Sequence, residues 1–394
     1  MSYLVGRFIT EEGKQNFKNY KYVSGEYSST DLLLNPFWEW TTELFPMWMA
    51  PNLITFMGLL AAVLPCMLML YYDLGKAYLS TSQPLPEYTY LLVAIGTFVY
   101  QTLDSVDGKQ ARRTGSSSPL GQLFDHGCDF VCWVFSIIGV IAFLELGLCF
   151  NGVLAIYSTI GPFFFFNLLE YYSGVYHYVV GGIDGTSSQM LVIFLYLLPF
   201  IFGANVYQSK ISEILPFMPG SLIEGFLLKD AVILIAVYIG VVCSIPLIFK
   251  TFSSIKEPYL KLIAALQTIQ HLAIYVCLYM VDPTIPFIKE NASLVYLLFG
   301  MLFALGNFKL IVCHMAKMQF EIVCFELLLF VPYFYFQSHY DGSKQSEDNI
   351  KLAFHATFLV MFIIVARFTQ TSITQMTQYL GISCFTIENK KKTS

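Results

Sequence analysis

The sequence predicts an all-α, polytopic integral membrane protein with about ten transmembrane helices, preceded by an amphipathic helix at the membrane interface. Charged residues make up 12% of the 394 residues, whereas soluble domains carry about 25%. Apolar residues reach 56%, and the mean hydropathy is +0.61. The net charge of -5 provides no basic field for nucleic acid, so we expect no nucleic-acid partner.

The N-terminal region, residues 1–49, is predicted to be cytoplasmic and to carry the interfacial helix. Residues 1–30 are polar and lack the apolar core of a cleavable signal peptide. The run LLLNPFWEWTTELFPMWMA (residues 32–50) then places tryptophans and phenylalanines among few polar residues, as in helices that lie at the headgroup level. Such a helix either anchors the chain or forms one wall of a lipid access path.

Ten apolar stretches follow, and each is predicted to cross the bilayer, for which about 20 apolar residues are typical. An even number of spans puts both termini on one side. Of the 22 lysines and arginines, 16 lie on that side and 6 on the other, which predicts cytosolic termini. The predicted spans are residues 53–72, 88–103, 123–143, 153–169, 190–202, 231–249, 262–280, 295–312, 322–336 and 352–365.

Four carboxylates lie at the cytosolic ends of the second and third spans, where charge is costly and usually functional. Asp104 and Asp107 are spaced i,i+3, and Asp125 and Asp129 are spaced i,i+4, so each pair shares one helix face. The short turn from Arg113 to Pro119 would fold the two faces together. Oxygen ligands alone suit the hard ions Mg²⁺, Mn²⁺ and Ca²⁺, so we expect a two-metal centre that clamps a phosphoryl group.

The acidic string also contains small residues, and as a whole it resembles a known signature. It reads Asp104-x2-Asp107-Gly108-x2-Ala111-Arg112-x8-Gly121-x3-Asp125-x3-Asp129, and it is similar to the signature of the CDP-alcohol phosphotransferases. The longer run DGKQARRTGSSSPLGQLFDHGCD (residues 107–129), with APNLIT (residues 50–55), resembles the eukaryotic choline and ethanolamine branch. The specific resemblance covers roughly residues 35–130.

The resemblance implies a role for each matching residue. The four aspartates would hold two Mg²⁺ or Mn²⁺ ions, and Asn52 would contact the CDP-alcohol. Gly108, Ala111 and Gly121 would make room for cytidine, although small residues also serve helix packing. Arg112 would contact phosphate or orient a carboxylate. Gln122 and Gly127 belong to the same substrate-binding run. The branch usually has Glu at the position of Gln122, so the headgroup preference stays open.

Two assignments within the site have alternatives. His126 resembles the general base that takes the proton of the lipid hydroxyl, with Asp129 as the alternative, and we favour His126 because a carboxylate that binds cations is a poor base. Glu170, Tyr171, Tyr172 and Tyr176 are headgroup candidates through cation–π attraction, or else an interfacial aromatic belt. Glu321 and Glu326 show no defined pairing in the sequence, and a structural role is favoured.

The resemblance therefore implies an enzyme that transfers phosphocholine or phosphoethanolamine from CDP-choline or CDP-ethanolamine to diacylglycerol and releases CMP. The alternatives are another headgroup or a cation transporter. Residues 50–252 would form the catalytic core, residues 253–380 would add four spans, and residues 381–394 would form a cytoplasmic tail. Lys391 and Lys392 in that tail resemble a retrieval signal, which predicts an endoplasmic reticulum or Golgi membrane. The family also implies a homodimer.

Overall fold

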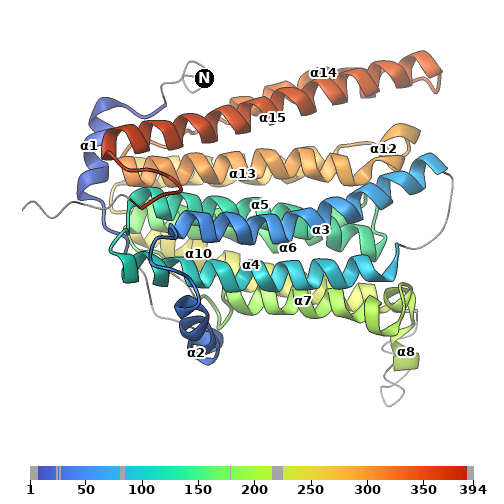
Figure 1. Cartoon of the computed structure of the whole chain (residues 1–394). Helices are drawn as coiled ribbons and strands as arrows, with labels where there is room; N and C mark the ends of the chain where they lie inside the picture. The colour runs from blue at the N-terminus through green and yellow to red at the C-terminus, as the bar shows by residue number, and fades with distance from the viewer. Residues whose placement is uncertain are drawn as a thin grey trace, which may run out of the picture.

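The computed structural model describes residues 8–23, 25, 28–79, 85–177, 179–214 and 225–387, and in this part of the chain the structure is helical with no strand (Figure 1). The helices are α1 (Glu11–Asn19), α2 (Ser29–Glu43), α3 (Pro51–Leu79), α4 (Glu87–Thr114), α5 (Pro119–Leu144), α6 (Phe150–Ser173), α7 (Gly185–Phe202), η2 (Val206–Gln208), α8 (Ile211–Ile214), α10 (Leu228–Ser254), α11 (Pro258–Tyr279), α12 (Pro286–Glu290), α13 (Ala292–Ala316), η3 (Phe325–Phe330), α14 (Val331–Ser338) and α15 (Lys344–Leu380).

The predicted class, an all-α multi-pass membrane protein, is confirmed. In the described ranges, eight helices are long and apolar enough to cross a membrane: α3, α5, α6, α7, α10, α11, α13 and α15. Two of the ten predicted spans are not among these eight helices. One is α4, which has 28 residues but carries Asp104 and Asp107 near its end. The other, residues 322–336, is not one continuous helix but the six-residue η3 followed by the eight-residue α14.

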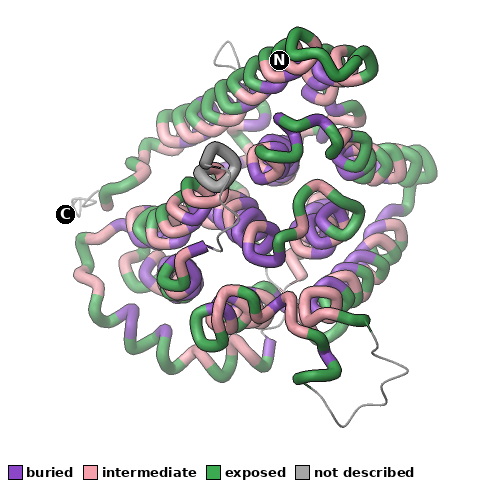
Figure 2. The backbone as a smooth tube through the Cα atoms, turned by 90° about the vertical axis from the view of Figure 1, so that its right-hand side faces the viewer, coloured by how far each residue is buried: buried purple, intermediate pink, exposed green. Residues whose placement is uncertain are grey.

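Three helices form the centre of the bundle. In α5, α6 and α13 the most apolar stretches are 78%, 72% and 83% buried, whereas the corresponding stretch of α7 is 17% buried. Figure 2 shows this arrangement end-on, with buried positions gathered on the inner helices. Because α13 packs against both α5 and α6, a helix from the C-terminal part of the chain completes the core around the predicted site.

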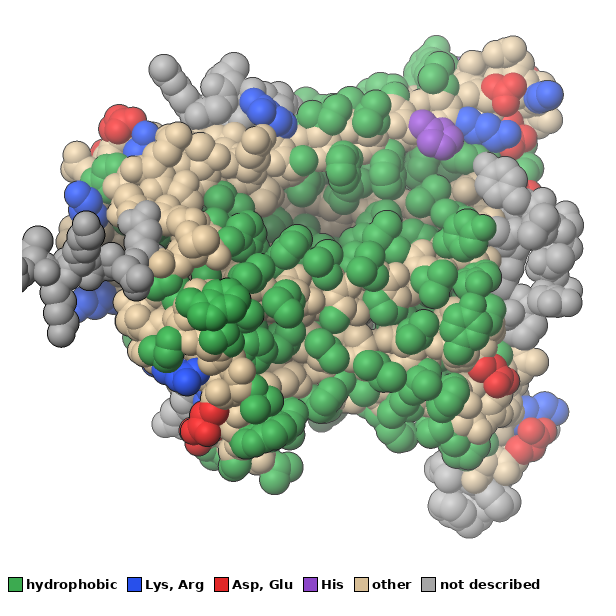
Figure 3. All heavy atoms as spheres, viewed as in Figure 1, with side chains coloured by type: hydrophobic (Ala, Val, Ile, Leu, Met, Phe, Trp, Pro, Cys, Tyr) green, Lys and Arg blue, Asp and Glu red, His purple; other side chains and the backbone are tan. Residues whose placement is uncertain are grey.

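The outer surface is that of a membrane protein. Hydrophobic side chains cover the middle of the face in Figure 3, while the charged side chains lie toward its two ends. Side chains such as Phe362 on α15 and Leu64 on α3 are exposed along this belt. An apolar belt between two charged rims matches the hydrocarbon core and headgroup layers of a bilayer.

The predicted interfacial helix is α2, which begins with a capping box formed by Ser28 and Asp31. It ends at Glu43, short of the predicted limit, and its Leu33 and Trp40 side chains are exposed. Arg113 fixes the turn that follows, because its Nη1 donates hydrogen bonds to the carbonyl oxygens of Thr42 at 3.0 Å and Phe45 at 2.8 Å. Helix α2 lies at one end of the bundle (Figure 1), and Leu33 and Trp40 are on its exposed face.

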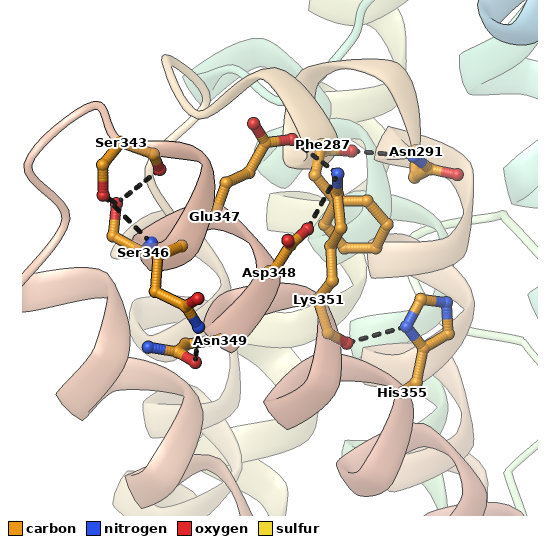
Figure 4. A network of polar contacts seen from close by, with 10 residues as sticks. Phe287, Asn291, Ser343, Ser346, Glu347, Asp348, Asn349, Lys351 and His355 are labelled. Carbon is orange, nitrogen blue, oxygen red and sulfur yellow. Dashed lines mark hydrogen bonds and ion pairs between the residues drawn. The ribbon is translucent and has the colours of Figure 1, made fainter.

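Figure 4 shows the opposite end of the bundle, where surface side chains form a local network of hydrogen bonds and ion pairs. Ser343 caps α15, and the Lys351 ammonium pairs with Glu347 at 3.0 Å and with Asp348 at 3.8 Å. The same ammonium lies 5.9 Å from the ring centroid of Phe287 on α12. Exposed pairs of this type contribute little stability.

The C-terminal tail returns to the end of the bundle where α3 and α5 begin. Thr386 forms an isolated β-bridge with Met49. The ring of Phe385 contacts Phe56 and Phe124, with centroid distances of 5.8 Å and 5.5 Å. Lys391 and Lys392, on which the retrieval signal depends, lie outside the described residues.

Candidate active site

The turn between α4 and α5 follows local sequence rules. Gly115 ends α4 in the left-handed conformation, with φ at 66°. Ser118 then caps α5 by accepting a hydrogen bond from the Gly121 amide at 3.1 Å, and Pro119 occupies the first helical position. Both carboxylate pairs thus lie at the same end of the bundle, as predicted.

The carboxylates come together across the space between α4 and α5, which α3 bridges by packing against both helices. Oxygens of Asp104, Asp125 and Asp129 lie within 4.8 Å of one another, and we call these three residues the carboxylate centre. Asp107 is buried beside it and accepts a hydrogen bond from the Thr55 hydroxyl on α3. Asp129 accepts one from the Tyr100 hydroxyl at 3.0 Å.

The donor set fits a hard divalent cation. Oδ1 of Asp104 is buried and has no hydrogen-bond partner in the structure. Among the described residues, no ion pair with a lysine, arginine or histidine neutralises these aspartates. Buried carboxylates at such separations can remain ionised together only when a positive charge compensates them. Asp104, Asp125 and Asp129 would hold one Mg²⁺ or Mn²⁺ ion, and the adjoining Asp107 would serve the predicted second ion.

A cavity of about 660 Å³ opens onto the carboxylate centre. Its polar end is lined by Asp104, Asp107, Asp125, Asp129, Gly108, Arg112 and His126, together with residues from α2 such as Asp31 and Glu39. Away from that end the lining comes from α5, α6, α7 and α10 and is mostly apolar. The aspartates therefore stand where a polar chamber changes into an apolar one.

The small residues of the signature differ in their surroundings. A Cβ atom at Gly108 would meet only Nη1 of Arg112, at 3.5 Å, and one at Gly121 would meet Ser118 and Asn52 at ordinary contact distances. Gly108 lines the cavity and leaves room there for a flat group, whereas Gly121 is not part of the cavity lining. At Gly127 a Cβ would lie 2.4 Å from the Phe308 ring on α13, so this glycine permits close helix packing.

Asn52 and Ala111 lie close to this end of the bundle but do not line the cavity. Asn52 is buried at the start of α3, and its Nδ2 lies 3.7 Å from Sγ of Cys384 in the C-terminal tail. Ala111 is partly exposed near the end of α4, where its carbonyl accepts the amide of Ser116 at 2.9 Å. Their predicted contacts with the CDP-alcohol stay predictions.

His126 lines the cavity directly beside the carboxylate centre. Its ring centroid lies 5.1 Å from that of Tyr176 and 6.1 Å from that of Tyr22. Two aromatic rings thus lie close to the imidazole. The position is suitable for exchanging a proton with a substrate in the cavity.

The four headgroup candidates do not share one environment. Tyr176 lines the cavity. The Tyr171 hydroxyl donates to the Met318 carbonyl at 3.1 Å, and the Tyr172 hydroxyl donates to Oε1 of Gln267 at 2.9 Å, so both are used in packing. Glu170 is only 2% exposed and is likewise outside the cavity lining.

Glu170 and Gln122 belong to one buried polar cluster. Nε2 of Gln122 donates to Oε1 of Glu170 at 3.3 Å, and Nε2 of His314 lies 3.7 Å from the same oxygen. Burial, and after it the negative charge of Glu170, raises the pKa of the neighbouring Tyr20 phenol. Glu170 of α6 thus lies beside Gln122, the position where the choline and ethanolamine branch usually has Glu.

Two groups that organise the site were missed in the sequence. Tyr100 lies one helical turn before Asp104, and Thr55 ends the APNLIT run. The i,i+4 spacing of Tyr100 and Asp104 was available as a signal, but tyrosine is common at membrane interfaces. The contact between Thr55 and Asp107 joins residues 52 positions apart and has no local signal.

Together, the fold and the site define a multi-pass membrane protein with an acidic centre on the wall of a cavity that continues into its apolar interior. Residues 48–242 match the sequence profile of the CDP-alcohol phosphatidyltransferase family. Cholinephosphotransferase 1 of Xenopus laevis is 30% identical over 399 residues, which cover 97% of this chain and 92% of that protein. The chain therefore belongs to the CDP-alcohol phosphatidyltransferase family and is a membrane transferase of phospholipid biosynthesis.

Two further relatives span most of the chain. Cholinephosphotransferase 1 of Homo sapiens is 32% identical over 314 residues, 77% of this chain and 73% of that protein. An uncharacterized CDP-alcohol phosphatidyltransferase class-I family protein 3 of Dictyostelium discoideum is 28% identical over 411 residues, 97% of this chain and 99% of that protein. The family predicted from the signature is thereby confirmed.

Proposed function

We propose that the protein transfers phosphocholine or phosphoethanolamine from the CDP-alcohol to diacylglycerol. The diacylglycerol hydroxyl oxygen attacks the β-phosphorus, and a new P–O bond forms. The bond from that phosphorus to the bridging pyrophosphate oxygen breaks, and CMP leaves with the bond's electron pair. The hydroxyl proton passes to a protein base. The products are CMP and phosphatidylcholine or phosphatidylethanolamine.

The observation that carries this proposal is the position of the carboxylate centre at the border between polar and apolar parts of one cavity. A CDP-alcohol is water-soluble, whereas diacylglycerol is dissolved in the bilayer. A reaction between them needs one chamber that is open to both environments. Divalent cations held by the aspartates would supply charge stabilisation for the pyrophosphate and for the leaving CMP.

The protein's own side chains have separate tasks in this proposal. His126 is the general base, because it faces the cavity and is not part of the carboxylate centre. Arg112 faces the same chamber and contacts phosphate, while Gly108 leaves space there for the cytosine ring. Tyr176 meets the headgroup cation through its ring. Asp129 is the less suitable base because it accepts a hydrogen bond from Tyr100 and shares cations with its neighbours.

We place the carboxylate centre and both termini on the cytosolic side of an endoplasmic reticulum or Golgi membrane. The excess of lysine and arginine on the side of the termini supports this orientation. The bridge between Met49 and Thr386 supports a common side for the tail and the start of α3. A homodimer is proposed from the family resemblance alone.

The test is CMP release by the purified protein with diacylglycerol and with CDP-choline, CDP-ethanolamine or a CDP-inositol analogue in competition. We expect at least one amine headgroup to be used and inositol to be rejected. Failure of both amine headgroups, with release from the third, would move the protein to another headgroup class.

The base is tested by His126→Ala, with His355→Ala as the matched control because His355 is exposed on α15 and hydrogen-bonds to the Lys351 carbonyl at the other end of the bundle. We expect the first variant to lose turnover by at least about a hundredfold while it still binds the CDP-alcohol, and the control to match the parent protein. Near-normal turnover of His126→Ala would transfer the role to Asp129.

A further inference from the structure

We propose that Tyr22, in the segment between α1 and α2, is a positioning residue that holds the His126 imidazole toward the cavity. This inference rests on the proposed function, in which His126 is the general base. It adds a residue that lies outside the family-matched residues 48–242. We call residues 20–23 and 25 the N-terminal strap, because the chain is anchored on both sides of this segment.

The His126 ring needs support from outside its own helix. The torsion that turns an imidazole about its Cβ–Cγ bond has broad minima, so α5 alone does not fix the direction of the ring nitrogens. In the described part of the chain, aromatic rings rather than a hydrogen bond contact this imidazole. A general base works only when its nitrogen lies within hydrogen-bond reach of the substrate proton. A group that orients the ring therefore also acts on the rate.

Tyr22, Tyr176 and His126 form a cluster of three rings. The centroid of the Tyr22 ring lies 6.1 Å from that of the imidazole, at an interplanar angle of 84°. Tyr176 completes the cluster, with its centroid 5.1 Å from the imidazole and 6.3 Å from the Tyr22 ring. Edge-to-face packing is a favourable geometry for aromatic pairs. Because both tyrosines contact the imidazole, a rotation of its ring would disturb both contacts.

The two tyrosines differ in what else they contact. Tyr176 lines the cavity together with His126, so a substrate can touch both side chains. Tyr22 is not among the described residues that line the cavity, and its side chain is 38% exposed on the protein surface. Tyr22 therefore contacts the base without facing the substrate. We expect its effect on the reaction to pass through His126.

The strap is tied by its backbone to the segment that follows α6. The Gly25 amide donates to the Tyr176 carbonyl at 2.8 Å, and the Tyr176 amide donates to the Val23 carbonyl at 2.9 Å. Beyond the strap, the Ser28 hydroxyl donates to Oδ2 of Asp184, the residue that caps α7, at 3.0 Å. These bonds give the strap a defined place beside the cavity.

The chain before the strap is anchored on the C-terminal helices. Helix α1 packs against α13 and α15 at one end of the bundle (Figure 1). Nδ2 of Asn16 donates to the Ala316 carbonyl at 2.8 Å, and Oε1 of Gln375 accepts the Ile9 amide at 3.0 Å. Only a short segment joins this anchor to Tyr22. Helices α13 and α15 thus help to place a ring at the base on α5.

The first test measures CMP release by full-length Tyr22→Ala and Tyr22→Phe. Loss of the ring should lower kcat by about tenfold or more, because the imidazole loses one of its two ring contacts. The KM values for the CDP-alcohol and diacylglycerol should stay within about twofold of the parent values. Tyr22→Phe keeps the ring and should hold kcat within about threefold of the parent.

Two further variants control this test. Tyr259→Ala, at an exposed position on α11, should match the parent protein. Tyr22→Leu keeps apolar bulk without a flat ring, so it should melt at the parent temperature and still lose kcat. A parent-like kcat for Tyr22→Ala, a loss that Tyr22→Phe shares, or a rise in KM in place of the fall in kcat would overturn the proposal.

A double-mutant cycle tests whether Tyr22 acts through His126. When His126→Ala is already present, the further change Tyr22→Ala should lower the remaining turnover by less than about twofold. An undiminished loss in that background would mean that Tyr22 acts on the substrate or on another group. That result would overturn the positioning role.

Chemical modification separates this inference from the proposed reaction. His126 is only 8% exposed and Tyr22 packs on its ring, so Tyr22→Ala should speed its reaction with diethyl pyrocarbonate several-fold, as measured by mass spectrometry. His355, exposed on α15, is the internal reference. An unchanged rate at His126 would overturn the inference whatever the activity. A faster rate, together with a parent protein that releases no CMP with any headgroup, would keep the contact and reject the proposed reaction.

Discussion

The protein contains two acidic clusters that differ in how their negative charge is balanced. In the carboxylate centre, oxygens of three aspartates lie within 4.8 Å of one another with no protein cation paired to them in the described ranges. In the second cluster, the Lys309 ammonium lies 2.8 Å from Glu321 and 2.8 Å from Glu326. We call Lys309, Glu321 and Glu326 the buried triad.

The difference in charge balance indicates which acidic cluster supports the fold and which is suited to bind a metal. Groups of Glu321, Cys324 and Glu326 lie as close together as those of the carboxylate centre, so proximity alone would suggest a metal at both places. The triad has its own cation and adjoins only a cavity of about 20 Å³. The carboxylate centre adjoins the large cavity and needs a cation from outside. We propose that the balance of charge and the access for a ligand distinguish a fold-stabilising cluster from a reactive one.

The largest expected effect comes from removing the triad's cation. Lys309→Met leaves two carboxylates without their partner, one of them almost fully buried, and should destabilise the protein by roughly 3–5 kcal/mol. The double variant Lys309→Met with Glu326→Gln should recover much of that loss. Thermal unfolding in detergent measures the stability of both variants. An unchanged melting temperature for Lys309→Met would show that the triad does not stabilise the fold.

The second prediction exchanges one carboxylate for an amide in each cluster. Asp125→Asn should lower the rate of CMP release by more than about a hundredfold, because it removes a ligand at the reacting group. Glu321→Gln should retain most of the activity of the folded protein. The reverse pattern in the release assay would assign the reactive role to the triad.

A smaller effect is expected from the hydrogen bond that orients Asp129. Tyr100→Phe removes the hydroxyl that donates to this carboxylate at 3.0 Å, which is worth about 1.5–3 kcal/mol for a charged acceptor. We expect a loss of about tenfold in kcat/KM with metal dependence retained. Tyr335→Phe, at an exposed position on α14, is the matched control, and equal rates for both variants would contradict the orienting role.

The sequence predicted the carboxylate centre because the information for it is local. Helical spacing within each aspartate pair and the turn residues Gly115, Ser118 and Pro119 are enough to bring the two helix ends together. The separation of Asp107 from the other three aspartates depends on a contact that is distant in the sequence. Asp107 is turned toward Thr55 on α3, and this depends on how α3 packs between α4 and α5.

Longer-range contacts also explain what the sequence did not predict. Lys309 on α13 pairs with Glu326 on η3, a segment that was predicted as part of a continuous span. Tyr171 and Tyr172 were grouped with Tyr176 as headgroup candidates, but partners far along the chain take up their hydroxyls. An aromatic cluster in a sequence does not reveal which of its rings face a cavity.

We propose that the carboxylate centre takes its missing positive charge from divalent cations and uses it for transfer. The most direct measurement is CMP release by chelator-treated protein as Mg²⁺ or Mn²⁺ is added back, with diacylglycerol and the preferred CDP-alcohol present. We expect no release without metal, recovery on addition, and no recovery in Asp125→Asn. Full release in the presence of chelator would contradict it.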